Sequence, residues 1–445
     1  MKYKVAFETL GCRLNQAETA TLYRGFLDRG YEVVADSSQA DLCVINTCAL
    51  TSQAASKCRR KVRSILKKNP QACVAAIGCY AQTDVDALRN IKGIDYIVGT
   101  ADKLTLPDIV SSPCKLPEVR VLNARITEDR FLIPGAGHYP FHTRANVKVQ
   151  EGCDFVCSFC IVPRGRGPAR SRDFADILRE ARELIALGHR ELILTGVNIG
   201  TYRDGEQGLA DVVRALMRLE GLDRIRLSSI EPTTVEPVII DMMAEGSKLC
   251  PYLHLPVQSG DDDVLAAMRR KYSVKEYITF VRSIIKRVPD VGIGTDIMVG
   301  FPGESDSAYK RSCDLIRSLP FTHIHVFSFS ARERTGAYSL RGKLPARVIT
   351  DRSAEMHLLA ERKKKEYYLS QKDKRLNVLF EQRESNGLFA GFSDNYVKVA
   401  VNTELDLSNR FATVRIYGVF QEDAAAPLLA TGDIVDVEAA GAARK

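Results

Sequence analysis

The sequence lacks any apolar run long enough to cross a membrane. A membrane-spanning helix needs about 18 consecutive apolar residues, and no stretch of the 445-residue chain comes near that length. The first residues, MKYKVAFETLGC, also lack the basic start and apolar run of a signal peptide. No internal repeat or low-complexity tract is present. These absences argue against a membrane or exported protein, and we expect a cytoplasmic one.

Disulfides are not expected either, although twelve cysteines are present, because the cytoplasm keeps thiols reduced. Cysteines that cluster are therefore candidates for metal binding or catalysis. The composition, with 45% hydrophobic and 27% charged residues, is that of an ordinary globular protein. Its length allows two or three domains with substantial cores.

Basic residues gather in three places, although the net charge is only +8. Residues 57–68, KCRRKVRSILKK, hold seven basic residues and no acid, and residues 361–375, ERKKKEYYLSQKDKR, hold seven basic and three acidic residues. The third set is Arg164, Arg166, Arg170 and Arg172. A single such run can be the solvated face of a helix, but three together are typical of contacts to a phosphate backbone. We therefore expect a nucleic acid partner.

The first hundred residues alternate between strand and helix patterns. The apolar runs YKVAFETLG, ADLCVINT and ACVAAIG predict buried parallel strands, and residues 15–29 and 52–68 predict amphipathic helices. This order predicts an open α/β sheet with helices on its faces, which we place at residues 1–115.

A cysteine follows each of these three strands: Cys12, Cys48 and Cys79. The carboxyl ends of parallel strands line up along one edge of an open sheet, where ligands bind. We therefore expect the three thiols to meet at one site, where they could hold a metal cluster. The alternative is that they are three small buried residues, since free cysteine packs well.

Strand and helix patterns alternate six more times after a proline-rich connector, residues 116–141. The predicted strands are NVKVQE, ELILTG, RIRLSSIE, YLHLPVQ, IGTDIMVG and HIHVFSFS. Six βα units in residues 142–370 predict a partial barrel, short of the eight that close a full one, with function at the C-terminal ends of its strands. A basic helix over residues 352–374 then leads into alternating segments that predict a small all-β barrel at residues 371–438.

The stretch EGCDFVCSFCIVPRGRG holds Cys153, Cys157 and Cys160 in the pattern C-x3-C-x2-C. Four cysteines would suit a closed structural zinc site, whereas three thiolates on a four-iron cluster leave one iron open to bind a small molecule. The motif therefore predicts a cluster with an open iron, and zinc with a distant fourth ligand is the alternative. The cysteines without such a context are interpreted as packing residues: Cys43, Cys58, Cys73, Cys114, Cys250 and Cys313.

Small and polar residues follow several predicted barrel strands, in the segments TGVNIG, SSIEP and GTDIMVGFPGE. Glycine allows close backbone approach, and Ser, Glu and Asp can bond amine or ribose hydroxyl groups. The candidate contacts to a bound nucleoside are Gly196, Ser228, Glu231 and Asp296.

The C-x3-C-x2-C motif and the six βα units resemble the radical S-adenosylmethionine (SAM) superfamily. The resemblance implies that Cys153, Cys157 and Cys160 hold a [4Fe-4S] cluster whose open iron chelates the amino and carboxylate groups of SAM. An electron from the cluster then cleaves SAM to a 5′-deoxyadenosyl radical. The four candidate nucleoside contacts would face SAM.

With both cysteine trios in view, the chain resembles the methylthiotransferase family along nearly its whole length. The matching segments, in order, are GC…N…E, NTC, GC, EGCDFVCSFC, RGRGPARSR, HLPVQSG and GTDIMVGFPGE. The resemblance implies an auxiliary [4Fe-4S] cluster on Cys12, Cys48 and Cys79, and an RNA-binding β-barrel of the TRAM type at the C-terminus. It also implies two SAM molecules per turnover. One methylates a sulfur on the auxiliary cluster, and the other yields the radical that removes a hydrogen from an unactivated carbon.

Members of this family act on an adenosine 3′ of the tRNA anticodon or on an aspartate of a small-subunit ribosomal protein. The segments TLGCRLNQAET, TGVNIG and QEGCDFVCSFCIVPRGRGPARSR resemble the branch acting on N6-threonylcarbamoyladenosine at position 37. The isopentenyladenosine branch has GCQMN- and GQNVN-like segments instead. A threonylcarbamoyl carboxylate favours a basic partner, and Arg13 beside Cys12 is the candidate.

The implied partners are the anticodon stem-loop of tRNA and an electron donor such as flavodoxin or ferredoxin, with the protein acting as a monomer. An alternative of another class is a tRNA- or zinc-binding protein that retains the fold without catalysis. The two intact cysteine trios argue against it, because a binding protein has no chemical need for either.

Overall fold

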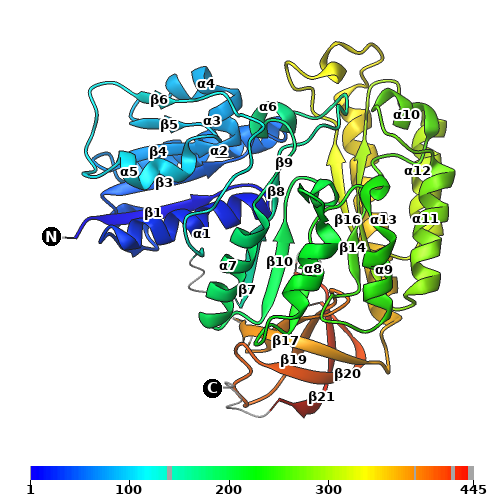
Figure 1. Ribbon diagram of the computed structural model, residues 1–445. Coiled ribbons are helices and arrows are strands. Elements are labelled where there is room, and N and C mark those ends of the chain that lie inside the picture. Colours follow the sequence, from blue (N-terminus) through cyan, green and yellow to red (C-terminus); the bar gives the residue numbers. More distant parts are fainter. Residues whose placement is uncertain (1, 138–142, 385–386, 422–425, 439–445) are drawn as a thin grey trace.

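Parallel strands at the start of the chain pair in the order β2–β1–β3–β4–β5–β6 and form an open sheet (Figure 1). The structure, a computed structural model, describes residues 2–137, 143–384, 387–421 and 426–438. The strands are β1 (Lys4–Thr9), β2 (Glu32–Val34), β3 (Leu42–Thr47), β4 (Cys73–Gly78), β5 (Tyr96–Val98) and β6 (Arg120–Leu122). The helices are α1 (Arg13–Asp28), α2 (Ser52–Lys68), α3 (Cys79–Thr83), α4 (Val85–Arg89) and α5 (Leu106–Ile109), with short 3-10 turns η1 (Ser37–Gln39) and η2 (Lys103–Thr105). The predicted open α/β sheet is confirmed.

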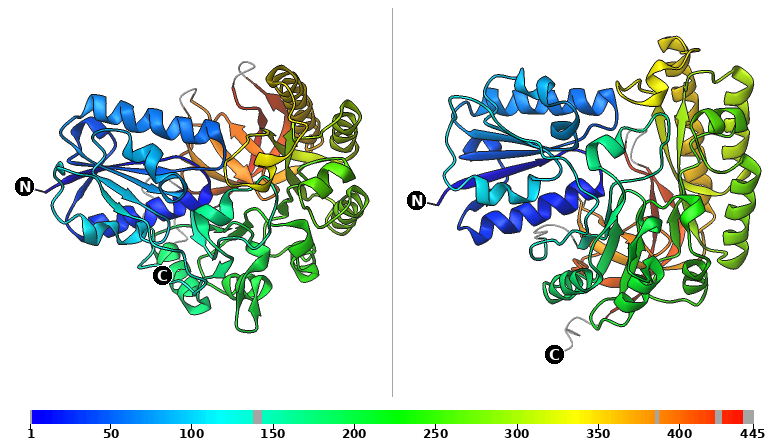
Figure 2. Two further views of the ribbon diagram at one scale, coloured as in Figure 1. Left: turned by 90° about the horizontal axis from the view of Figure 1, so that it is seen from above. Right: turned by 45° about the horizontal axis from the view of Figure 1, so that its top comes forward.

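Strands β3 and β4 are buried along their whole length, because helices cover both faces of the sheet (Figure 2). Val74 packs in one core with Val62 of α2, and Ala75 packs in the other with Phe26 of α1. Helix α2 spans the predicted residues, and the Thr51 hydroxyl caps its first turn. Helix α1 begins two residues earlier than predicted, directly after Cys12 at its N-cap position.

Strand β6 lies inside the segment predicted as a connector and pairs with β5. Its three residues are exposed or half-buried, so no apolar run in the sequence indicates a strand there. Backbone pairing defines it instead. Residues 138–141 of the predicted connector, and residue 142 of the next predicted domain, lie outside the described residues.

Six parallel strands form the predicted partial barrel. They are β7 (Arg144–Lys148), β10 (Glu191–Thr195), β13 (Arg224–Leu227), β14 (Tyr252–His254), β15 (Gly292–Val299) and β16 (Phe321–Ser328). The ladders β7–β10–β13 and β14–β15–β16 are joined by single parallel bridges, Ile225 to Leu249 and Ser229 to His254.

Helices cover the outside of this barrel (Figure 1). They are α7 (Phe174–Ala186), α8 (Leu209–Met217), α9 (Pro237–Ala244), α10 (Asp262–Ala267), α11 (Val274–Arg287), α12 (Asp306–Ser318) and α13 (Ala346–Leu369). Short elements around the barrel are β8 (Gln150–Glu151), α6 (Val162–Arg166), β9 (Arg170–Ser171), η3 (Ile199–Thr201), β11 (Arg203–Asp204), β12 (Gln207–Gly208), η4 (Pro232–Thr234) and η5 (Gly336–Ser339).

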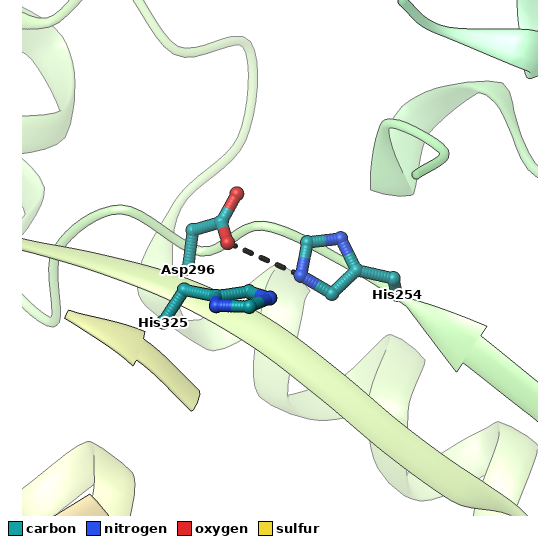
Figure 3. A group of neighbouring side chains, drawn as sticks. All are labelled: His254, Asp296 and His325. Carbon is teal, nitrogen blue, oxygen red and sulfur yellow. Dashed lines mark ion pairs between the residues drawn. The ribbon is translucent and has the colours of Figure 1, made fainter. Parts of the chain in front are cut away.

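Barrel strands alternate between polar residues that face the lumen and apolar residues that face the helices, as the period of two requires. In the lumen, His254, Asp296 and His325 from β14, β15 and β16 point toward one another (Figure 3). On the other side, Leu253 and Leu255 flank His254 and join the hydrophobic core.

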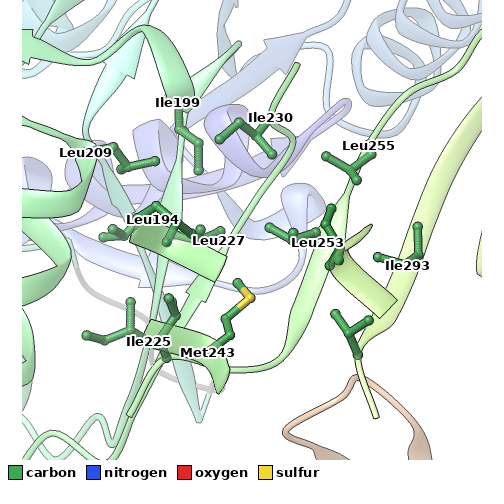
Figure 4. Close-up of a cluster of buried hydrophobic side chains, with 14 of the residues drawn as sticks. Leu194, Ile199, Leu209, Ile225, Leu227, Ile230, Met243, Leu253, Leu255 and Ile293 are labelled. Atoms are coloured by element: carbon green, nitrogen blue, oxygen red, sulfur yellow. The ribbon is translucent and has the colours of Figure 1, made fainter. Parts of the chain in front are cut away.

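That core fills the space between the barrel strands and their helices (Figure 4). Its labelled members are Leu194, Ile199, Leu209, Ile225, Leu227, Ile230, Met243, Leu253, Leu255 and Ile293. Each is at most 4% exposed, so the strands that carry the polar lumen are fixed from outside by dense packing.

The C-terminal strands form a closed five-stranded barrel, which confirms the predicted β-barrel. The strands are β17 (Arg375–Arg383), β18 (Phe389–Ser393), β19 (Lys398–Val401), β20 (Phe411–Phe420) and β21 (Leu429–Val437). This small barrel lies against the N-terminal ends of the larger barrel's strands (Figure 1). Arg226 of β13 donates to the carbonyls of Ser393 and Asp394 at 3.0 and 2.9 Å, which ties the two together.

Helix α13 begins six residues earlier than predicted and ends at Leu369, before the predicted end at residue 374. Pro345 precedes it and supplies the extended N-cap. The residues after it turn away from helical geometry, with Asp373 at a φ of 67°. None of the helices in the described part of the chain combines the length and apolar character that crossing a membrane requires.

Candidate functional site

Cys12, Cys48 and Cys79 follow β1, β3 and β4 and meet at the carboxyl edge of the N-terminal sheet. A Cβ placed on Gly11 would lie only 3.2 Å from the Cβ of Cys48, so the first two loops touch. Burial, together with the neighbouring Cys79 and Cys12 thiols, raises the pKa of the Cys48 thiol to about 12. The expected meeting of these cysteines is therefore what the fold produces.

Cys153, Cys157 and Cys160 lie on one loop after β8. The Cys160 amide donates to the Cys157 carbonyl at 3.1 Å, which bends the loop back on itself. Burial raises the pKa of Cys153 to about 11 and that of Cys160 to about 12. Thiols with such pKa values are protonated at neutral pH, and because a metal ligand must be a thiolate, metal binding here releases protons.

Neither cysteine trio has the spacing of a site for one ion. Among the described residues, the group whose ligand atoms all lie within 4.8 Å of one another is His254, Asp296 and His325 (Figure 3). Sulfur ligands about 2.3 Å from one tetrahedral zinc would lie closer together, roughly 3.8 Å apart. The wider trios suit a cluster in which each thiolate binds a different iron. The residues present therefore fit [4Fe-4S] clusters better than single zinc ions.

The polar group in the barrel lumen contains Asp296, one of the predicted nucleoside contacts. Its Oδ1 lies 3.1 Å from His254 Nε2, and Ser229 Oγ lies 2.9 Å from the other ring nitrogen of His254. Burial alone would raise the pKa of Asp296, but the His254 imidazole holds it below its usual range. Asp296 is therefore an anion that can accept hydrogen bonds from a ligand in the lumen.

The other three predicted contacts occupy different environments. Ser228 Oγ is buried without a hydrogen-bond partner among the described residues, so it can bond a ligand. Glu231 receives two hydrogen bonds of 2.7 Å from Arg270. A Cβ on Gly196 would lie 2.8 Å from Gln150 Oε1, so this glycine is required for close packing behind the lumen.

Arg270 is a residue that sequence reasoning missed. Besides Glu231, it approaches Cys157, with Nη1 3.5 Å from Sγ. Arg269, at a φ of 61°, turns the chain just before it. The local sequence around Arg270, RRKY, does not indicate this role, because its partners Glu231 and Cys157 belong to distant segments of the chain.

Tyr396, in the turn between β18 and β19, is a second missed residue. Its hydroxyl accepts a hydrogen bond from Arg13, and its ring lies 4.6 Å from that of Tyr252. Burial favours the neutral phenol, but Arg13, Arg144 and Arg226 lower its pKa below the usual value. Arg13, predicted as the partner of a carboxylate, therefore extends from its position beside Cys12 to Tyr396 in the lumen.

A groove of about 1260 Å³ runs beside the cysteine loops, between the N-terminal domain and the barrel. Its charged and polar lining includes Gln82, Asp84, Arg125, Arg164, Arg332 and Arg334. Arg332 pairs with Asp84 at 3.0 Å, which holds the two sides together. Glu128 and Glu333 line the groove as well, so its four arginines face three acidic residues and its charge is mixed.

The expectation that the third basic set contacts phosphate is wrong for Arg166 and Arg172. Their side chains are 3% and 0% exposed. Arg172 pairs with Asp176 at 2.6 Å and with Glu180. The carboxylates that bury these arginines come from separate elements, so the basic run alone could not reveal them.

The chain matches two family models: the radical SAM superfamily over residues 147–316, and uncharacterized protein family UPF0004 over residues 4–99. It is 32% identical over 424 residues to the threonylcarbamoyladenosine tRNA methylthiotransferase MtaB of Bacillus subtilis, covering 93% of each chain. It is 34% identical to the MtaB of Aquifex aeolicus, covering 89% of this chain and 96% of the relative. It is also 31% identical to a tRNA-2-methylthio-N(6)-dimethylallyladenosine synthase of Syntrophus aciditrophicus, covering 93% and 88%.

Among solved structures, the chain is similar to the radical SAM methyltransferase TsrM of Kitasatospora setae with cobalamin and a [4Fe-4S] cluster bound. The TM-score is 0.55 at 15% identity, and the match covers 74% of this chain and 75% of that one. At this identity the likeness shows the fold alone.

Proposed function

The chain belongs to the radical SAM methylthiotransferase family, and we propose that it methylthiolates carbon 2 of N6-threonylcarbamoyladenosine at position 37 of tRNA. The product is 2-methylthio-N6-threonylcarbamoyladenosine. The enzyme uses [4Fe-4S] clusters and SAM, as its family does. Cellular tRNA as the substrate implies that it acts in the cytoplasm.

We assign one cluster to each cysteine trio, Cys153, Cys157 and Cys160 for SAM and Cys12, Cys48 and Cys79 for the auxiliary cluster. The two sets lie on separate domains that face one another, and α3 contacts α6 between them. When bound, the first cluster supplies the electron that cleaves SAM, and the second presents the sulfur that is transferred. The lumen residues Ser228 and Asp296 would bond SAM or the substrate nucleoside.

The position of Arg13 is the observation that favours the threonylcarbamoyl substrate. A threonylcarbamoyl group ends in a carboxylate, whereas a dimethylallyl group has no charge. Arg13 follows Cys12 directly, and its guanidinium lies in the lumen at the Tyr396 hydroxyl. A carboxylate a few ångströms from the reacting carbon could therefore take a charged hydrogen bond from Arg13.

The test is Arg13→Gln assayed on tRNA carrying either adenosine derivative. Losing a charged hydrogen bond costs roughly 1.5–3 kcal/mol, or about 10- to 150-fold in kcat/KM for the threonylcarbamoyl substrate. Release of 5′-deoxyadenosine without tRNA should not change. Arg282→Gln, on the exposed face of α11 and outside the proposed tRNA contacts, is the matched control. Equal loss in both variants, or preference of the wild type for the dimethylallyl substrate, would show that the substrate assignment is wrong.

We also propose how the tRNA is held. Exposed basic residues of α2, the groove beside the cysteine loops and the C-terminal barrel, as a TRAM domain, would contact the anticodon stem-loop. The domain boundaries proposed for this arrangement are 1–115, 116–141, 142–370 and 371–438. A flavodoxin or ferredoxin would donate the electron, and the enzyme would act as a monomer.

A further inference from the structure

A buried network of charged side chains joins the two domains that carry the cysteine trios. Its members are Glu18 of α1, Lys103 of η2, Lys148 of β7, Glu151 of β8, Arg166 of α6 and Arg170 of β9. Five of these side chains are between 1% and 3% exposed, and Arg170 is 11% exposed. Charges buried this deeply are costly unless they are paired.

Each carboxylate of the network binds cations from the barrel. Arg166 Nη1 lies 2.8 Å from Glu18 and 2.7 Å from Glu151. Lys148 lies 3.0 Å from Glu18 and 2.7 Å from Glu151. Lys103 lies 2.6 Å from Glu18. Because Glu18 and Lys103 belong to the N-terminal domain, these pairs fix its position on the barrel.

The network carries more positive than negative charge. Four cations, Lys103, Lys148, Arg166 and Arg170, surround two carboxylates, which leaves an excess of two positive charges. An excess of buried charge calls for further anions nearby. Besides Glu18 and Glu151, the anion-forming groups that act electrostatically on Arg166 include the Cys79 and Cys12 thiols of the auxiliary trio.

Two contacts link Arg166 to these thiols, one through Asn15 and one through Gly165, the residue before it. Its Nη2 donates to Asn15 Oδ1 at 2.6 Å, and the same oxygen lies 3.8 Å from Cys12 Sγ. A Cβ on Gly165 would lie 3.5 Å from the Cβ of Cys79. Burial disfavours the charged guanidinium, but Cys79 and Glu18 raise the pKa of Arg166 well above its usual value.

We propose that Arg166 is a positioning residue for the auxiliary cluster, and that the cation excess around it makes this cluster easier to reduce. The inference rests on the proposed function for the assignment of Cys12, Cys48 and Cys79. Three thiolates give a [4Fe-4S] centre net negative charge, which grows on reduction, and fixed cations beside it favour the reduced form. The same ion pairs hold the auxiliary cysteines over the loop that carries the SAM-binding cysteines.

The test isolates the auxiliary cluster in the full chain with Cys153, Cys157 and Cys160 changed to Ala. Its midpoint potential is measured by a redox titration followed by electron paramagnetic resonance, with iron content determined on the same samples. Arg166→Met removes a cation and should make the potential more negative. Glu18→Gln removes an anion and should make it more positive. Structural damage would not produce shifts of opposite sign.

Two further variants keep the test decisive. Lys103→Met removes a different cation and should shift the potential in the same direction as Arg166→Met, even if that variant folds poorly. Arg172→Met is the control, because Arg172 is equally buried but pairs with Asp176 and Glu180 on α7, and it should leave the potential unchanged.

The outcomes separate the inference from the proposed function. A cluster that forms with the same potential in the Arg166 and Glu18 variants, or with shifts of the same sign, overturns the inference alone. The chain in which only Cys153, Cys157 and Cys160 are replaced should still hold the auxiliary cluster. If it holds none, both the assignment of the auxiliary cysteines and the inference are wrong.

Discussion

Gly152, one residue before Cys153, has no room for a side chain. Its φ is +72°, and a Cβ placed on it would lie 1.7 Å from the carbonyl oxygen of Pro168. Contacts of this kind are not found below 3.0 Å, so either the Pro168 backbone or the cysteine loop would have to move by more than 1 Å. Left-handed backbone strain and overpacking together cost roughly 2–5 kcal/mol.

We therefore expect Gly152→Ala to displace the first ligand of the proposed SAM cluster. The variant should bind less iron after anaerobic reconstitution and release little 5′-deoxyadenosine, while the auxiliary cluster still forms. Iron analysis, SAM cleavage and urea unfolding of the same preparation measure these effects.

Gly135 provides the matched control for this substitution. It has a φ of +77°, close to that of Gly152, but no atom of the described residues lies within 4 Å of the position of its Cβ. Gly135→Ala should therefore cost only the backbone strain of about 1–2 kcal/mol and leave iron content and SAM cleavage unchanged. Wild-type iron content and SAM cleavage in Gly152→Ala would refute the reasoning about this loop.

Three more predictions follow from the structure. Cys48→Ala should still release 5′-deoxyadenosine but transfer no methylthio group; normal methylthiolation by this variant would contradict the assignment of a second cluster. Burial lowers the pKa of His323 from 6.5 to about 3. The imidazole therefore binds a proton more tightly in the unfolded chain than in the folded one, and the folded state loses stability as pH falls below 6.5. His323→Gln should thus raise the free energy of unfolding at pH 5 by roughly 2 kcal/mol and change it little at pH 8, as urea titrations would measure. Arg415→Gln, on an exposed face of the C-terminal barrel, should weaken tRNA binding and reduce the log–log salt slope by about 0.9 for a duplex contact; an unchanged slope would place the tRNA elsewhere.

Deleting the C-terminal barrel would be a poor test of tRNA binding. Its removal would expose Arg224 and Arg226, which donate to carbonyls of that barrel and are nearly buried. Tyr396 would also be lost from the lumen, where it accepts a hydrogen bond from Arg13. Point substitutions on the exposed face separate RNA binding from these structural roles.

The elements that carry the cysteines could be predicted because their signals are local. Buried parallel strands have continuous apolar runs, and the ends of such strands share an edge, so the meeting of Cys12, Cys48 and Cys79 followed from the pattern. The segment of strand β21, LATGDIVDV, gives a weaker local signal, because Gly432 and Asp433 interrupt its apolar residues.

Pairs of side chains that lie far apart in the sequence could not be predicted from local patterns. Arg166 was interpreted as a phosphate contact because its partner Glu18 lies 148 positions earlier in the chain. Tyr396 gave no sign of reaching Arg13, since the two lie 383 positions apart and belong to different domains. Sequence periodicity identifies faces of helices and strands, but only the packed domains show which charges those faces bring together.

The most direct test of the account is analysis of the nucleosides made by the purified enzyme. The reconstituted protein, SAM and a reductant are incubated anaerobically with tRNA that carries N6-threonylcarbamoyladenosine at position 37, and the digested tRNA is examined by mass spectrometry. The expected product is 2-methylthio-N6-threonylcarbamoyladenosine, with 5′-deoxyadenosine formed alongside it. If the N6-threonylcarbamoyladenosine stays unmodified while the same preparation methylthiolates tRNA that carries dimethylallyladenosine, the proposed substrate is wrong.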